Sequence, residues 1–265
     1  MSARVRTALW AGAGFLAVLV FGGPWGFGVL TAAVAALGAA EYFRMAVAEP
    51  DPLEHLGVSL WAGAVVLGFL CPDPGVPGLL VAAGAAGYVL VRILGSGPSP
   101  DGLARWGAAV AAWVGVGYFL GHLVWIREVG VSAVVFLLAV VWAGDTAAYY
   151  VGSAIGERRL APAVSPKKSV EGAVASLAAA AILGAVVSLL LPVPHGMIRG
   201  AGIALAVNVA AQLGDLLESV WKRSAGVKDS GTLLPGHGGV LDRVDALLLA
   251  APAYAGILKL LGAGP

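Results

Sequence analysis

Cysteine, charge and side-chain amides are all scarce in this sequence of 265 residues. Cys71 is its only cysteine, which excludes an intramolecular disulfide and a thiolate metal cluster, and we expect it to be a buried, small apolar residue. Charged residues make up only 12% of the chain, and the 16 basic residues nearly balance the 15 acidic ones. The composition therefore gives no reason to expect a nucleic-acid partner.

Hydrophobic residues dominate instead, at 59% of the chain, with a mean hydropathy of +0.90. Long apolar runs are each close to the roughly 20 residues that a helix needs to cross a membrane. We predict an all-α, polytopic integral membrane protein with about nine transmembrane helices. The first is expected to be retained, because no clear signal-peptide cleavage site precedes Phe21. The predicted helices cover residues 5–22, 25–43, 56–71, 77–95, 104–125, 131–153, 170–191, 198–221 and 244–262.

These helices fall into two regions. Residues 1–130 form an N-terminal region of about five transmembrane helices, and residues 131–265 form a second region that contains two large polar loops, 154–169 and 222–243. With the N-terminus inside, most basic residues fall on the inner side, which predicts that both loops face the cytoplasm. The basic residues on the outer side are Arg127, Arg199 and Lys259.

Carboxylates stand inside the predicted helices. Asp145 lies within 131–153, and Asp215 and Glu218 lie within 198–221. A charge at such depth costs at least about 2.5 kcal/mol unless it lines a wet cavity or has a partner, so these residues are functional candidates. Polar residues spaced by 4, 3, 4 and 3 form one helical stripe with Asp215: Asn208, Gln212, Ser219 and Lys222. The helix before it repeats the pattern with Asp145, Thr146, Tyr149 and Ser153. Each stripe is either a functional polar face or a polar seam that fixes helix packing.

Residues 219–245 combine basic side chains, carboxylates and a glycine-flanked histidine. Cations neutralise phosphates and glycines allow close backbone approach, so the combination suits a metal–polyphosphate substrate. Its members are Lys222, Arg223, Lys228, Asp229, Gly236, His237, Gly238, Gly239, Asp242, Arg243 and Asp245. A second basic segment, Ser165-Pro-Lys-Lys-Ser169, precedes the helix predicted over 170–191, and Ser169 with Glu171 predicts the start of that helix. His55, His122 and His195 stand alone in or beside apolar segments, and we assign them structural or interfacial places.

The 219–245 segment closely resembles the signature of the phosphatidate cytidylyltransferases, also called CDP-diacylglycerol synthases. Asp145-Thr-Ala-Ala-Tyr149 and Ser165-Pro-Lys-Lys-Ser-Val-Glu-Gly172 look like that family's second conserved block, and Gln212-Leu-Gly-Asp215 looks like its third. The resemblance covers residues 140–250 well, whereas the first 130 residues match only as generic membrane spans.

The resemblance implies that the chain transfers the cytidylyl group of CTP to phosphatidate, giving CDP-diacylglycerol and pyrophosphate, with Mg²⁺ either alone or together with a second cation. It further implies a bacterial inner-membrane enzyme whose site faces the cytoplasm, in contact with membrane lipid, and a possible homodimer. The implied metal ligands are Asp215, Asp242 and Asp245. The implied catalytic residues are Asp215, Asp242, Lys222, Arg223, Lys228 and Arg243. The implied substrate-binding residues are Lys167, Lys168, Ser165, Ser219, His237, Gly238, Gly239, Asp145 and Tyr149.

In that scheme Lys222, Arg223 and Lys228 hold the phosphates of CTP, while Lys167 and Lys168 hold the phosphatidate headgroup or share the triphosphate. His237 either donates to a phosphate or caps its turn. Two other functions stay open. A CTP-dependent lipid-alcohol kinase would need a base for a neutral hydroxyl, and no carboxylate is left over for that role. A non-enzymatic ion or lipid transporter would explain the deep carboxylates but not the dense cationic loop.

Overall fold

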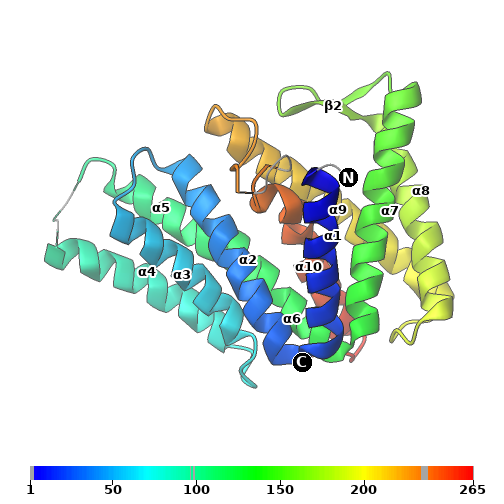
Figure 1. The fold of residues 1–265 in the computed structure, drawn as a ribbon, viewed down its shortest axis with the longest axis horizontal. Coiled ribbons are helices and arrows are strands. Elements are labelled where there is room, and N and C mark those ends of the chain that lie inside the picture. Colours follow the sequence, from blue (N-terminus) through cyan, green and yellow to red (C-terminus); the bar gives the residue numbers. More distant parts are fainter. Residues whose placement is uncertain (1–2, 96, 98, 234–237, 265) are drawn as a thin grey trace. The chain divides into compact units, whose positions relative to one another are not determined.

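The computed structural model describes residues 3–95, 97, 99–233 and 238–264, and these residues are mostly helical (Figure 1). In chain order the helices are α1 (Ala3–Phe21), α2 (Gly23–Ala46), α3 (Pro52–Gly68), α4 (Val76–Gly95), α5 (Gly102–Ala112), the π-helix η1 (Trp113–Tyr118), α6 (Phe119–Val129), α7 (Val131–Ile155), α8 (Val170–Leu190), α9 (Met197–Ser224) and α10 (Leu241–Leu260). Two short strands, β1 (Arg159–Ala161) and β2 (Ser165–Ser169), pair as an antiparallel hairpin. Each predicted span thus corresponds to a helix, and 104–125 corresponds to the continuous run from α5 through η1 to α6.

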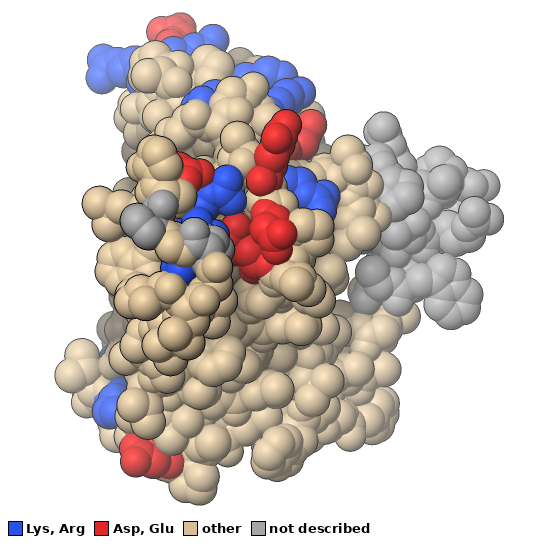
Figure 2. All heavy atoms as spheres, turned by 90° about the vertical axis from the view of Figure 1, so that its left-hand side faces the viewer, with Lys and Arg blue, Asp and Glu red and all other residues tan. Residues whose placement is uncertain are grey.

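Six helical stretches of the described chain are long and apolar enough to cross a membrane. They are Gly23–Ala46, Val76–Gly95, Gly102–Val129, Val131–Ile155, Val170–Leu190 and Met197–Ser224. Figure 2 shows broad areas of one face without Lys, Arg, Asp or Glu, as contact with lipid requires. The prediction of an all-α integral membrane protein is therefore confirmed, whereas the number of nine transmembrane helices stays a prediction.

The chain divides into two compact units. The first comprises Met1–Val124 and Ser224–Arg243, and the second comprises Trp125–Arg223 and Val244–Pro265. Most of the predicted polar loop 222–243 thus belongs to the first unit, although α9 before it and most of α10 after it belong to the second.

In the first unit, small residues let α2 and α3 approach each other closely. A Cβ on Gly63 would lie 3.1 Å from the carbonyl oxygen of Ala32. In its first turn, α3 is joined to α5 by an ion pair in which Arg105 Nη1 lies 2.9 Å from Glu54 Oε2. Cys71 is exposed, so the prediction that it is buried was wrong. The reason is that α3 ends at Gly68 and the following turn leaves Cys71 at the surface.

In the second unit, α7 and α8 pack along each other. A Cβ on Gly172 would lie 2.8 Å from the carbonyl oxygen of Ala148, so glycine is required there for the helices to come this close. Ser169 accepts a hydrogen bond from the backbone N–H of Gly172 at 3.1 Å, which confirms that it caps the start of α8. The predicted polar loop 154–169 is folded into the β1–β2 hairpin.

The connection between α8 and α9 is held by a histidine. The side chain of His195 is almost fully buried and lies between two hydroxyl groups, with Nδ1 3.3 Å from Ser188 Oγ and Nε2 3.0 Å from Tyr254 OH. This agrees with the structural place assigned to His195 from the sequence.

Candidate active site

A lysine and two aspartates from three elements meet in the second unit. Lys168 Nζ on β2 lies 2.5 Å from Asp215 Oδ2 on α9, and Asp145 on α7 interacts electrostatically with both. These residues line a small cavity of about 60 Å³ together with residues of α8 and Gln212. The structure therefore brings together Asp145, Lys168 and Asp215, which are far apart in the sequence.

The β1–β2 hairpin explains how Lys168 reaches this cavity. Pro166 lies in β2, and the strand ends at Ser169, whose hydroxyl caps α8, so the backbone on both sides of Lys168 is fixed. At the other end of the hairpin, Arg223 Nε on α9 donates to the carbonyl of Val164 at 3.2 Å. The hairpin is thus tied both to α8 and to the helix that bears Asp215.

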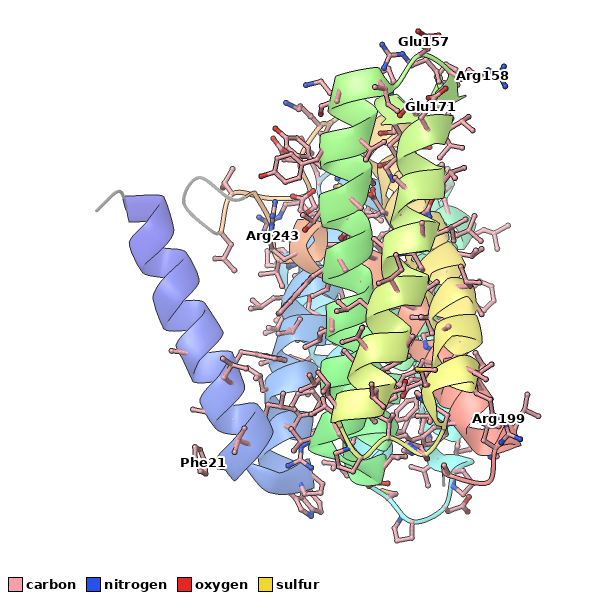
Figure 3. The ribbon with its side chains drawn as sticks, turned by 90° about the vertical axis from the view of Figure 1, so that its right-hand side faces the viewer. Phe21, Glu157, Arg158, Glu171, Arg199 and Arg243 are labelled. Atoms are coloured by element: carbon pink, nitrogen blue, oxygen red, sulfur yellow. The ribbon has the colours of Figure 1, made fainter. Side chains whose placement is uncertain are left out.

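Charged residues flank this end of the second unit. The backbone N–H of Arg158 donates to both carboxylate oxygens of Glu171 at 3.3 Å. Figure 3 shows Glu157, Arg158 and Glu171 at one end of α7 and α8, and Arg199 at the other end of this unit. Lys167 is exposed, while Ser165, which pairs with Ala161, is half-buried.

The polar stripe of α9 has two parts with different roles. Asn208 is buried and accepts hydrogen bonds from Ser176 of α8 at 3.0 Å and from Gln212 at 2.8 Å. This part is a packing seam, although Gln212 also borders the cavity. Farther along, Ser219 donates to Asp215 Oδ1 at 3.5 Å. The functional interpretation therefore stays a prediction for the C-terminal half of the stripe.

A second group of charges follows on α9 and α10. Glu218 is fully buried and forms an ion pair with Lys222, one turn later on α9. Asp245 on α10 interacts electrostatically with Asp215 and Lys222. Close approach of the two helices is possible because of Gly214, where a Cβ would lie 2.6 Å from the backbone oxygen of Asp245. Lys222, for which the resemblance implies a role in phosphate binding, thus also neutralises a buried carboxylate.

In the first unit, Asp242 fixes the start of α10. Its Oδ2 accepts hydrogen bonds from the backbone N–H of Ser230 at 3.0 Å, the hydroxyl of Ser230 at 3.0 Å and the backbone N–H of Gly239 at 2.8 Å. Gly238 adopts φ +79°, and a Cβ there would lie 2.7 Å from Asp242 Oδ2. Contact with Asp242 therefore explains the glycine at position 238. Three residues later, Asp245 lies on the same face of α10.

Glu41 is a residue that the sequence reasoning did not single out. It lies on α2 and accepts hydrogen bonds from the backbone N–H groups of Val240 and Leu241 at 2.9 and 2.8 Å. It also accepts a hydrogen bond from the hydroxyl of Ser230 at 2.9 Å. A carboxylate inside an apolar helix was the available signal, the same one that pointed to Asp145.

The remaining candidates are less constrained. Lys228 and Arg243 are exposed, and Tyr149 is 68% exposed and stacks edge-on with Tyr150. His237 lies outside the described residues, as do Leu234, Pro235 and Gly236. Within the part of the chain that the structure describes, no three His, Cys, Asp or Glu side chains form a ready-made metal site.

The chain is similar to known proteins over most of its length. The chain matches the cytidylyltransferase family over residues 2–261. A protein of Brucella suis named phosphatidate cytidylyltransferase is 51% identical over 123 residues, which is 46% of this chain and 45% of that protein. Proteins of the same name from Bacillus subtilis and Synechocystis are 38% identical over 157 residues and 42% identical over 123 residues. These alignments cover 58% of both chains for the first, and 46% of this chain and 42% of the relative for the second.

The aligned part of the chain spans about half the length of these curated relatives. The family match, in contrast, extends over nearly the whole sequence and includes both polar segments and the carboxylates of α7, α9 and α10. The chain belongs to the cytidylyltransferase family.

Proposed function

We propose that this protein transfers the cytidylyl group of CTP to phosphatidate, forming CDP-diacylglycerol and releasing pyrophosphate. The observation that supports this most directly is the meeting of Lys168, Asp145 and Asp215 at a cavity in a membrane protein of the cytidylyltransferase family. Relatives named phosphatidate cytidylyltransferase add to this support.

The reaction joins two anions. A phosphate oxygen of phosphatidate forms a bond to the α-phosphorus of CTP, and the bond from that phosphorus to the bridging oxygen of pyrophosphate breaks. Because the nucleophile is already an anion, no general base is required. Catalysis then consists of bringing the reactants together in line and neutralising their charge.

Divalent metal fits the residues that are present. Among Asp145, Asp215, Glu218, Asp245, Lys168 and Lys222, four carboxylates face two lysines, so this group has an excess of negative charge. Mg²⁺ prefers oxygen ligands and usually takes only one or two carboxylates, with water and phosphate completing its shell. Asp215 and Asp245 would hold it in the second unit, and Asp242 at the start of α10 stays a ligand predicted from the sequence. Bound there, the ion would supply charge neutralisation for the phosphates.

The basic side chains then have distinct tasks. Lys168 holds Asp215 in place before substrate binds and is positioned to donate to a phosphate oxygen afterwards. Lys222, Arg223 and Lys228 follow along the chain and neutralise the triphosphate, while exposed Lys167 contacts the phosphatidate headgroup. Since Lys168 pairs with the proposed metal ligand, we assign it to both substrates and not to the lipid alone.

We further propose that the site faces the cytoplasm across a bacterial inner membrane. Within the second unit, Arg158 and Glu171 lie at the end with the hairpin and Arg199 lies at the other (Figure 3). Basic residues are most frequent at the hairpin end and at the C-terminus of α9, which favours a cytoplasmic position for both. CTP is a cytoplasmic metabolite, so this orientation gives it access.

The test is incubation of the purified chain with phosphatidate, Mg²⁺ and CTP labelled in either the α- or the γ-phosphate. Cytidylyl transfer predicts that α-label enters lipid and that γ-label leaves as pyrophosphate. Entry of γ-label into lipid would instead show a kinase. If neither labelled form of CTP gave labelled lipid, the transporter would be the remaining function. Either of these two outcomes would overturn the proposal.

A further inference from the structure

We propose that Glu41 is a positioning residue for the reaction, because it holds Ser230 and the backbone of residues 239–241 in the conformation that presents Asp242. This inference rests on the proposed function, since it assigns a role to Glu41 through Asp242. The residue lies on α2, 201 positions before Asp242 in the sequence, within the same compact unit.

Glu41 serves as an acceptor for the first turn of α10. The first N–H groups of any helix have no acceptor within the helix itself. Here Glu41 Oε1 accepts from Val240 N–H at 2.9 Å, and Oε2 accepts from Leu241 N–H at 2.8 Å. Both carboxylate oxygens are therefore used, and the start of α10 is fixed to α2.

The same carboxylate lies beside the group that holds Asp242. Ser230 Oγ is 2.9 Å from Glu41 Oε2 and 3.0 Å from Asp242 Oδ2. A hydroxyl has one hydrogen, so Ser230 donates to only one carboxylate at a time. Backbone N–H groups hold both carboxylates in either case: that of Leu241 bonds to Glu41, and those of Ser230 and Gly239 bond to Asp242.

Two glycines make room for Glu41. A Cβ on Gly231 would lie 2.5 Å from Glu41 Oε1, and a Cβ on Gly239 would lie 2.4 Å from Glu41 Oε2. Both distances are far below ordinary contact, so the backbone on two sides of the carboxylate is shaped around it. Ser230, Gly239, Val240 and Leu241 are all buried, so solvent has little access to these contacts.

The geometry therefore links α2 to the orientation of Asp242 through two steps. Glu41 fixes the backbone of residues 239–241, and this backbone with Ser230 supplies the donors that fix the Asp242 carboxylate. Glutamine at position 41 must place its NH₂ group against either Val240 N–H or Leu241 N–H, because glutamate uses both oxygens as acceptors. A donor then faces a donor, and the start of α10 has to move.

The first measurement is hydrogen exchange of the purified full chain in detergent, without substrate. In Glu41→Gln we expect the amide of Val240 or that of Leu241, whichever loses its acceptor, to exchange at least about tenfold faster than in the wild type. The matched control is Glu49→Gln, which removes an exposed carboxylate from the same unit and should leave the exchange of these amides unchanged.

The second measurement is the rate of α-label transfer from CTP to phosphatidate. We expect kcat of Glu41→Gln to fall by roughly 10- to 100-fold, as for loss of a group that orients a metal ligand, while KM for phosphatidate changes little. Glu41→Asp keeps the charge and should recover part of the rate. Gly231→Ala displaces the Glu41 carboxylate without removing it. If this variant folds, it should also show faster amide exchange at the start of α10 and a lower kcat.

Unchanged amide exchange in Glu41→Gln would overturn the inference, and so would faster exchange with an unchanged kcat. If Glu41→Gln does not fold, the same two readings are taken on Gly231→Ala with the same consequences. Failure of the wild type to transfer label would overturn the proposed function itself. A fully active wild type with a fully active Glu41→Gln would overturn only the role of Glu41.

Discussion

Lys168 and Asp215 form an ion pair of 2.5 Å that joins the β1–β2 hairpin to α9. Since this pair places Lys168 beside a proposed metal ligand, we expect Lys168 to act on both substrates and not on the lipid alone. Replacement of Lys168 by Met should therefore lower kcat/KM for CTP and for phosphatidate alike. Loss of one charge-assisted hydrogen bond costs about 1.5–3 kcal/mol, or roughly 10- to 150-fold in kcat/KM.

The measurement is a two-substrate kinetic matrix for Lys168→Met, with Arg199→Met as the control. Arg199 lies at the other end of the second unit, so its loss should leave both constants near wild-type values (Figure 3). A Lys168→Met variant that is impaired toward phosphatidate alone would instead assign Lys168 to the phosphatidate headgroup, the other alternative left open by the sequence.

The buried pair of Glu218 and Lys222 predicts a stability effect. Glu218 is fully buried, so Lys222→Met would leave its carboxylate inside the protein without the Lys222 charge. Breaking a buried ion pair in this way costs about 3–5 kcal/mol. In detergent, Lys222→Met should unfold at a clearly lower temperature than the wild type. The double variant Glu218→Leu/Lys222→Met should recover part of that difference in unfolding temperature. A double variant no more stable than the single one would show that the two side chains are not coupled.

The position of His195 predicts a pH dependence of stability. Burial lowers the pKa of His195 below its ordinary value of 6.5, so the folded protein takes up this proton less readily than the unfolded chain. The contribution of neutral His195 to the stability of the folded protein is therefore fully present above about pH 6.5, and it decreases as the pH falls below that value. Unfolding temperatures measured from pH 8 to 5 should fall less steeply for His195→Gln than for the wild type. Equal slopes would mean that this histidine does not titrate differently on unfolding.

Much of the second unit could be predicted from its sequence. The spacing of Asp215 and Ser219 placed them on one stripe, and their hydrogen bond confirms it. Ser169 was expected at the start of α8 and does cap it. These features depend on residues three or four positions apart in one helix, so periodicity and local chemistry suffice to find them.

Other features depend on contacts between distant segments and had no local signal. Ser230 and Glu41 are 189 residues apart, and nothing in the pattern around either residue indicates the other. The hairpin escaped prediction because its strands have only three and five residues. Cys71 was misjudged because its exposure is set by where α3 ends, which composition does not reveal.

The exposure of Cys71 also shapes the test of membrane orientation. Single cysteines at Ala163 and Thr232, both exposed, in a Cys71→Ala background should react with a membrane-impermeant thiol reagent only from the cytoplasmic side. Gly196→Cys, in the connection between α8 and α9, is the matched control and should react only from the outside. Reaction of Ala163→Cys or Thr232→Cys from the outside would contradict the proposed topology.

The central claim is that the carboxylates around Asp215 support cytidylyl transfer. The most direct measurement is the rate of α-label transfer from CTP to phosphatidate by Asp215→Asn and by the wild type, at saturating Mg²⁺ and with folding checked in detergent. Asparagine keeps the size of the side chain but removes the charge that pairs with Lys168 and that would bind the metal. We predict that the rate of the folded variant is at least about 100-fold lower than that of the wild type. Removal of a group that stabilises charge in the transition state has an effect of this size. A near-normal rate for Asp215→Asn would contradict the account.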